Sequence, residues 1–228
     1  MRDIAPAGGF WGLLSGPERE LLARAGRDSV FLPGATLCVQ GDPATHLFVL
    51  VSGWAKVVSV TRDGQQAVLA LRGNGDVVGE LAGEVTGYRT ATIYAIDRVE
   101  SVMVQHDRFN AFLDEYPSAG RAYRQMIIQR WSDTAESLRA RATCTGAQRL
   151  AGLLLELARR HGVGDGHRVV IDLPLSQTEL ASLVSASRAT VTRAFSDWRR
   201  RRLVETSQRH VTIIDAAALR RIAAPPGR

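Results

Sequence analysis

Residues 175–205 place two short helical segments on either side of a tight turn, and this arrangement restricts the fold more than any other feature of the chain. Ser176 is followed three residues later by Glu179, a capping box that begins the first helix. The apolar face of that helix consists of Leu180, Leu183 and Val184. Ser187 is placed to cap the second helix. The turn between the two helices consists of Ser185 and Ala186.

The second helix carries its apolar and polar residues on separate faces. The residues spaced to face the core are Val191, Phe195 and Trp198. The residues left exposed are Arg188, Ala189, Thr192, Arg193 and Ser196. Arginines near a helix N-terminus, beside small residues, suit insertion into the DNA major groove, where an arginine fork can bind guanine O6 and N7. The arginine run 199–202 would add contacts to the phosphate backbone.

The surrounding sequence and its charge extend this prediction to residues 144–228. A helix over 147–161, a glycine-rich turn over 162–166, a short strand and a final hairpin, RLVETSQRHVTIID, complete the pattern of a winged helix-turn-helix. This part holds 14 basic and 7 acidic residues, a net charge of +7, against 15 and 16, a net of −1, in residues 1–143. The alternative is a solvated, arginine-rich helix in an unrelated bundle. Capping, spacing and the hairpin favour DNA binding.

Residues 30–105 have the texture of a β domain. Short β-branched runs such as LFVLVSG, AKVVSVT and QAVLAL are separated by turn signals about ten residues apart. Asp63 and Gly64 form the clearest hairpin turn. We therefore expect an antiparallel sandwich or barrel. It is preceded by a short helical lead-in over 10–26, with Ser15 as a candidate N-cap.

A long helical run over 107–141, interrupted at Pro117, follows the β region. Its apolar stripe consists of Tyr123, Ile127, Trp131, Thr134 and Leu138. A stripe of this length needs a packing partner. We expect it to pair with the same helix of a second copy, so that Tyr123, Ile127, Trp131 and Leu138 form a homodimer interface. The alternative is that the helix folds back on the β domain.

The order of these parts, with GEL at 79–81, RTA at 89–91 and SRxTVxR at 187–193, resembles the cyclic-AMP receptor protein/fumarate–nitrate regulator superfamily. The resemblance covers essentially the whole chain. It implies an α+β fold with a β-sandwich jelly roll of the cyclic-nucleotide-binding type in residues 1–106, a dimerisation helix in 107–143 and a winged helix-turn-helix in 144–228. It also implies a bacterial, homodimeric transcription regulator that binds near-palindromic double-stranded DNA. RNA polymerase is a candidate partner, although no stretch of sequence can be assigned to that contact.

The resemblance assigns roles along the second helix. Arg188 and Arg193 would contact guanines or neighbouring phosphates, and the Thr190 hydroxyl would hold a phosphate. Ala189 stands where the family usually has an acid that accepts from a cytosine amine, so we expect a relaxed or altered preference at that base pair. The full predicted DNA-binding set is Ser187, Arg188, Ala189, Thr190, Thr192, Arg193 and Arg199.

The resemblance also makes the GEL and RTA stretches a phosphate-binding cassette. Gly79 would let the backbone approach the ligand, Glu80 would accept from a ribose 2′-hydroxyl, and Arg89 would bind the cyclic phosphate. Thr134 matches the family's purine-amine contact. The full predicted ligand set is Gly79, Glu80, Leu81, Ala82, Arg89, Thr90 and Thr134, and the expected allosteric effector is cyclic AMP in preference to cyclic GMP. The alternative is that Glu80 and Arg89 form a structural ion pair in an empty or differently occupied pocket.

The sequence offers less support for a different effector or for an enzymatic function. A haem sensor would need ligands such as Cys38 and His46, which stand isolated, and a ligand-independent regulator remains an alternative. A β-sandwich metal enzyme would need clustered ligands. The histidines are instead scattered, at positions 46, 106, 161, 167 and 210, so we expect neither an enzyme nor a metal site. Two cysteines without CxxC spacing, no run of eighteen apolar residues and no secretory signal lead us to expect a cytoplasmic protein without membrane contact.

Overall fold

The computed structural model describes residues 9–60, 63–64, 66–81, 87–164, 168–172, 175–207 and 210–224. The chain forms two compact units, residues 1–131 and 132–228, and the boundary between them falls within one long helix. Within the ranges just given, no helix is both long and apolar enough to cross a membrane.

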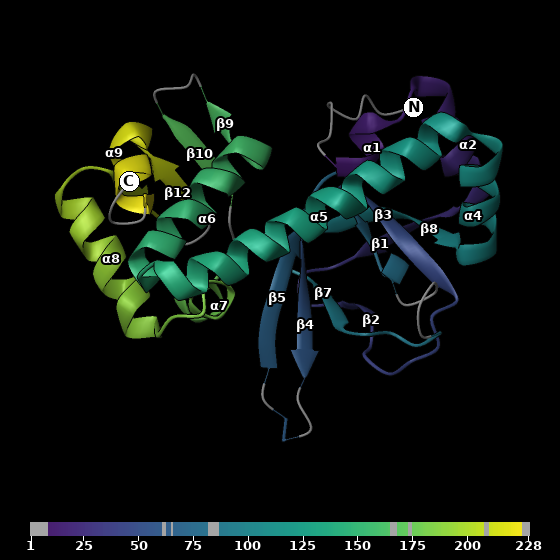
Figure 1. Cartoon of the computed structure of the whole chain (residues 1–228). Coiled ribbons are helices and arrows are strands. Elements are labelled where there is room, and N and C mark those ends of the chain that lie inside the picture. Colours follow the sequence, from purple (N-terminus) through teal and green to yellow (C-terminus); the bar gives the residue numbers. More distant parts are fainter. Residues whose placement is uncertain are drawn as a thin grey trace. The chain divides into compact units, whose positions relative to one another are not determined.

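The first unit contains two antiparallel sheets of four strands each (Figure 1). One has the strand order β1-β8-β3-β6 and the other β2-β7-β4-β5. The strands are β1 Arg27–Phe31, β2 Thr36–Cys38, β3 His46–Ser52, β4 Ala55–Val60, β5 Gln66–Arg72, β6 Val77–Val78, β7 Thr92–Ala95 and β8 Val99–Gln105. The predicted antiparallel β domain is confirmed, and β4 and β5 pair across Asp63-Gly64 as a hairpin.

Alternation along the central strands gives this unit two apolar cores. Phe48 and Leu50 of β3 contribute to a core formed by strands of both sheets, which makes the architecture a sandwich. Leu47 and Val49 point to the opposite face of their sheet, where they pack with residues of the helices. Strand β3 is therefore buried on both faces, which explains its nearly continuous apolar sequence.

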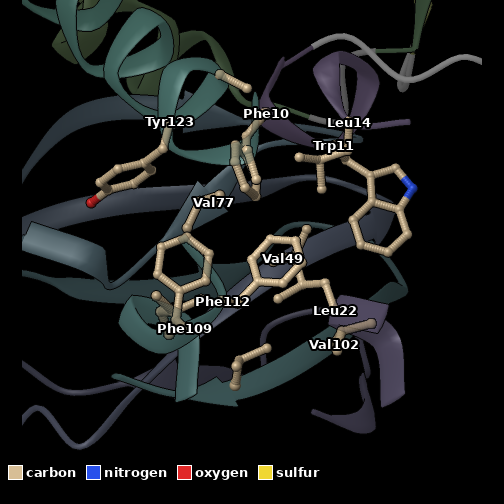
Figure 2. Packing of buried hydrophobic residues seen from close by; sticks show 14 of the residues in the cluster. Phe10, Trp11, Leu14, Leu22, Val49, Val77, Val102, Phe109, Phe112 and Tyr123 are labelled. Carbon is tan, nitrogen blue, oxygen red and sulfur yellow. The ribbon is translucent and has the colours of Figure 1, made fainter. Parts of the chain in front are cut away.

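Four helices contribute to the second of these cores: α1 Gly9–Leu13, α2 Gly16–Ala25, α4 His106–Glu115 and α5 Pro117–Thr143. Phe10, Phe109 and Tyr123 meet edge to face there, with ring centroids 5.3–6.1 Å apart. Figure 2 shows these three rings in one cluster with Val49 and Val77, which are labelled between Phe10 and Phe109. Ser15 is the N-cap of α2, as predicted, and with Glu18 it completes a capping box that was not predicted. Pro117 begins α5 at a position where its missing N–H costs nothing.

The apolar stripe of α5 differs from the prediction. Tyr123 is buried in the core of the first unit and Ile127 packs against it, so these two side chains belong to the interior of the protomer. The large apolar side chains that α5 exposes are Ile128, Trp131 and Leu138, with exposed fractions of 67%, 76% and 59%. Spacings of three and four residues fit two adjacent helix faces, and only tertiary packing distinguishes the buried one.

The second unit is a winged helix-turn-helix (Figure 1). Its elements are α6 Gly146–His161, β9 Val163–Gly164, β10 Val169–Asp172, α7 Gln177–Leu183, α8 Arg188–Arg200, β11 Val204–Thr206, β12 His210–Ile213 and α9 Ala216–Ala223. The antiparallel sheet order is β11-β12-β10-β9. Two elements were not predicted: β9 lies within the expected glycine-rich turn, and α9 follows the hairpin, where Asp215 caps it and Leu219 is fully buried.

Candidate functional site

Gly79 and Arg89 of the predicted ligand cassette are in contact. Gly79 directly follows β6 and has a φ of 82°, a left-handed conformation that favours glycine. A Cβ at this position would lie 2.4 Å from Nη1 of Arg89, and Nη1 donates a hydrogen bond to the Gly79 carbonyl at 3.0 Å. The glycine is therefore required both by its backbone conformation and by the arginine beside it.

Arg89 is held in place mainly by its backbone. Its N–H donates to the Asp42 carbonyl at 2.8 Å, and its carbonyl accepts from the Gly41 N–H at 2.9 Å. The side chain is only 3% exposed, and its Nη2 is buried without a hydrogen-bond partner in the part of the chain that the structure describes. A guanidinium stays charged in proteins, and a buried, unsatisfied charged donor is costly. Such a group is suited to bind an anion.

Glu80 pairs with Arg130 of α5, a residue that was not predicted. Nη1 of Arg130 contacts Oε1 of Glu80, and Nη2 donates to the Val77 carbonyl at 2.8 Å and to Asp76 at 3.4 Å. The alternative of a structural Glu80–Arg89 ion pair is therefore wrong for these described residues. A signal for Arg130 does exist in the sequence, because it lies four residues after Met126 on the buried face of α5. A basic residue on such a face requires an acidic partner.

The remaining predicted ligand residues take part in none of the contacts just described. Leu81 and Thr90 are exposed, and Ala82 lies outside the described residues. Thr134 is exposed on α5, four residues after Arg130 and therefore about one helical turn further on. The structure brings together Gly79, Glu80, Arg89 and Arg130, while the roles assigned to Leu81, Ala82, Thr90 and Thr134 stay predictions.

Cys38 and His46, the candidate haem ligands, both titrate away from their ordinary values. Burial raises the pKa of the Cys38 thiol, which disfavours the thiolate that a metal binds. Burial lowers the pKa of His46, and the charge of Arg89 acts in the same direction. Across the described ranges, no group of three or more His, Cys, Asp or Glu side chains could hold a metal ion.

In the second unit, side-chain caps and one left-handed residue shape the helix-turn-helix. Ser176 and Glu179 form the predicted capping box, and Ser187 Oγ accepts from the Thr190 N–H at 3.1 Å. Ser185 has a φ of 49°, and the Ala186 N–H donates to the Ala181 carbonyl at 2.9 Å, so α7 ends in a Schellman turn without its usual glycine.

Helix α8 presents the predicted faces. Its buried residues are Val191, Ala194, Phe195 and Trp198, and its exposed ones include Arg188, Ala189, Thr192, Arg193 and Ser196. Thr190 is half-buried, and its hydroxyl lies 2.9 Å from Ser187 Oγ. Arg188 and Arg193 thus lie on the exposed face of a capped helix, which is the geometry needed to reach base edges in a groove.

Three arginines at the end of α8 form hydrogen bonds or ion pairs with neighbouring side chains. Arg199 donates to Thr206 Oγ1 of β11 at 3.0 Å, which ties the helix to the wing. Arg200 and Arg201 both pair with Asp197, at 2.7 and 3.2 Å. All of these pairs are at the surface and contribute little stability, so the arginines remain free to exchange partners for phosphates.

Two family models match the chain. A cyclic nucleotide-binding domain matches residues 29–116, and a Crp-like helix-turn-helix domain matches residues 148–222. The first covers the sandwich with the Gly79–Arg89 contact, and the second covers the helix-turn-helix and the wing.

Relatives that match most of the chain agree with the two family models. The chain is 30% identical over 191 residues to a CRP-like cAMP-activated global transcriptional regulator of Mycobacterium tuberculosis, covering 84% of this chain and 85% of the relative. It is 29% identical to a global nitrogen regulator of Synechococcus elongatus, covering 83% and 86%. The solved structure of FixK2 from Bradyrhizobium japonicum has the same fold, with a TM-score of 0.77, 18% identity and coverage of 89% and 99%.

The Mycobacterium tuberculosis relative is named a transcriptional regulator, and its match spans most of this chain, overlapping the regions of both family models. The chain belongs to the cyclic-AMP receptor protein/fumarate–nitrate regulator superfamily of DNA-binding transcription regulators.

Proposed function

We propose that the protein is a homodimeric transcription regulator that binds near-palindromic DNA through α8 and is controlled by a cyclic nucleotide bound beside Arg89. Cyclic AMP is the proposed effector, in preference to cyclic GMP. RNA polymerase is its proposed partner at promoters.

The buried, unsatisfied Nη2 of Arg89 is the observation that carries the ligand part of this proposal. A cyclic phosphate carries negative charge and acceptor oxygens, so it can supply the hydrogen-bond partner that this nitrogen lacks. Gly79 places no side chain against Arg89, and Glu80, the next residue along the chain, is the proposed acceptor for the ribose 2′-hydroxyl. An uncharged ligand would leave the guanidinium charge uncompensated, so the proposal names an anionic effector.

Helix α5 supplies a route from ligand to DNA. It carries Arg130, which forms an ion pair with Glu80, and Thr134, which we assign to the base of the nucleotide. A nucleotide that touches both Arg89 and Thr134 gains both contacts only when α5 is aligned, so it favours the aligned state by its differential affinity. In a dimer, two α8 helices about 34 Å apart would then meet successive major grooves.

The names of the relatives bear on the choice of effector. One relative is named for activation by cAMP, while another is named as a nitrogen regulator, so membership of the family does not by itself select the ligand. Thr90, exposed beside Arg89, can serve either purine.

Calorimetric titration with cyclic AMP and cyclic GMP tests the ligand proposal. We expect saturable binding to the wild type and a loss of about a hundredfold or more in Arg89→Ala, because a charge-assisted pair with phosphate is removed. Arg98→Ala, at an exposed arginine elsewhere in the same unit, is the control and should bind normally. Absence of binding to the wild type, with DNA binding intact, would favour the ligand-independent regulator.

Fluorescence anisotropy at several salt concentrations tests the DNA proposal. Arg188→Ala and Arg193→Ala should weaken binding and lower the salt slope by about one if the arginine meets a phosphate, or relax one base preference if it meets a guanine. Arg24→Ala, exposed in the first unit, is the control. A wild-type protein that binds no duplex with or without nucleotide would refute the proposal.

A further inference from the structure

A hydrogen bond joins the two helices of the DNA-binding module on their exposed side. Thr192 of α8 donates from Oγ1 to Oε1 of Gln177 at 2.5 Å. Gln177 is the first residue of α7 and is half-buried, while Thr192 lies on the exposed face of α8, between Ala189 and Ser196. None of the roles described so far uses Gln177.

The direction in which Thr192 donates its hydroxyl proton determines which atom of the Gln177 amide is available to another partner. Thr192 Oγ1 also lies 3.0 Å from the Arg188 carbonyl, but a hydroxyl has one proton to donate. The Arg188 carbonyl already lies in the hydrogen-bond ladder of α8, whereas the Gln177 oxygen is the nearer acceptor. With its oxygen engaged, Gln177 keeps the two N–H donors of Nε2, for which the described part of this unit provides no partner.

We propose that Gln177 is a DNA contact that donates from Nε2 to a backbone phosphate, and that Thr192 is a positioning residue acting through it. This inference rests on the DNA-binding part of the proposed function. It changes the role predicted for Thr192, whose hydroxyl is directed at Gln177.

Position and charge favour phosphate over a base edge. In helix-turn-helix proteins the first helix crosses the backbone while the second lies in the groove, and Gln177 begins the first. Amide side chains are common phosphate donors. The nearest acid on α7, Glu179, accepts from the N–H and Oγ of Ser176, so its charge is engaged in the capping box.

The contact with Thr192 restricts the side chain of Gln177 before DNA binds. A free glutamine side chain must lose rotamer freedom on binding, and that entropy opposes the contact. A glutamine already held against α8 loses less. We therefore expect the contribution of Gln177 to depend on the hydroxyl at position 192.

The test measures the affinity of the full-length protein for two probes, a duplex that the wild type selects from a random pool and a mixture of random duplexes of the same length. The variants are Gln177→Ala, Thr192→Val, Thr192→Ser and the double variant Gln177→Ala/Thr192→Val. Thr212→Val, at a threonine of β12 in the same module, is the matched control. Melting temperatures are recorded to confirm that each variant is folded.

We expect Gln177→Ala to weaken binding to both probes by about three- to tenfold, as for one lost hydrogen bond to phosphate. The salt slope should stay unchanged because a neutral amide releases no counterion. Thr192→Val should lose a similar factor, the double variant little more than either single variant, and Thr192→Ser should bind nearly as the wild type does.

Three outcomes would overturn the inference. Wild-type affinity in Gln177→Ala would remove the phosphate contact. Fully additive losses in the double variant would show that Thr192 acts independently, and a changed selected sequence in Thr192→Val would make it a base-reading residue. Failure of the wild type to bind either probe would overturn both this inference and the DNA-binding proposal, whereas failure of the variants alone concerns Gln177 only.

Discussion

Arg89 and Arg130 are both nearly buried, yet among the described residues only the charge of Arg130 is balanced by carboxylates. Arg130 has carboxylate partners in Glu80 and Asp76, while Arg89 donates to a backbone carbonyl and keeps one nitrogen unsatisfied. A buried charge with an internal partner holds the fold together, and one without such a partner is suited to an external anion. At the scale of single residues, this difference separates a structural arginine from a candidate ligand arginine.

Gly79→Ala tests how closely the backbone and Arg89 depend on each other. The new Cβ would lie 2.4 Å from Arg89 Nη1 and would occupy a left-handed conformation. We expect a loss of about 1–3 kcal/mol in unfolding free energy, together with weaker binding of the anionic ligand, because Arg89 must move. Denaturant unfolding and calorimetry measure the two effects.

Gly34→Ala is the matched control, because Gly34 has the same φ of 82° and no atom within 4 Å of a Cβ. It should show the conformational cost alone, about 1 kcal/mol, with ligand binding unchanged. Equal effects of the two substitutions on ligand binding would mean that contact with Arg89 is irrelevant.

At the scale of elements, polar contacts at both Ser118 and Arg130 supplement the apolar packing of helix α5 in the first unit. Its N-terminal turn meets α2, where Ser118 donates to Oε1 of Glu18 at 2.5 Å. Further along, Arg130 joins it to Asp76 and Val77, which precede Gly79, and to Glu80, which follows it. Both attachments connect segments 50 or more residues apart in sequence, which is why neither follows from local patterns.

Arg130→Met should destabilise the first unit by about 2–4 kcal/mol, because it leaves Glu80 buried without its cation. Arg124→Met, at an exposed arginine of the same helix, should change stability by less than about 0.5 kcal/mol. Chemical denaturation of both variants is the measurement. Similar stabilities for the two would show that the Glu80–Arg130 pair contributes nothing net.

Glu18 makes the α2–α5 attachment sensitive to acid. Hydrogen bonds from Ser118 and then Ser15 hold the pKa of Glu18 below its ordinary value of 4.5. A depressed pKa adds stability above the unfolded-state value, and this stability is lost as pH falls through the folded-state value. Glu18→Gln should therefore be less stable than wild type at neutral pH by about 1–3 kcal/mol, with the difference shrinking below pH 4.5.

Thermal unfolding across pH 3–7, in steps of about one pH unit, measures the stability difference between Glu18→Gln and the wild type. Glu20→Gln, at an exposed glutamate of α2, is the control and should follow the wild type throughout. A Glu18→Gln deficit that is constant with pH would assign the effect to packing and not to charge.

At the scale of the whole molecule, the exposed face of α5 bears on assembly. Ile128, Trp131 and Leu138 are large apolar side chains left in contact with solvent on one helix. They recur at spacings of three and seven residues, as in a coiled-coil seam, with Ala135 between the last two. Burial of such side chains against a second copy is favourable, which supports the proposed homodimer.

Trp131→Glu should convert the dimer into a monomer, because a charge would be placed in the centre of an apolar seam. Gln125→Glu, at an exposed polar position of the same helix, adds the same charge and should leave the dimer intact. Sedimentation analysis of the two variants is the measurement. A wild type that sediments as a monomer at all accessible concentrations would contradict the homodimer itself.

The helix-turn-helix illustrates what the sequence alone determined. Capping pairs such as Ser176 with Glu179 act within one helical turn, and the buried positions of α8 recur at helical spacing, so local physics suffices to predict them. The same holds for the hairpin at Asp63-Gly64 and for the start of α5 at Pro117. Each of these features is specified by residues no more than a few positions apart.

Tertiary structure decided the partners of groups that local pattern leaves open. It paired Glu80 with Arg130 and not with Arg89, and it buried Tyr123 while exposing Ile128. It also added α9, whose Leu219 is buried in the second unit. Ion pairing and burial depend on distances in space between segments far apart in sequence, and a periodic pattern of residues does not contain those distances.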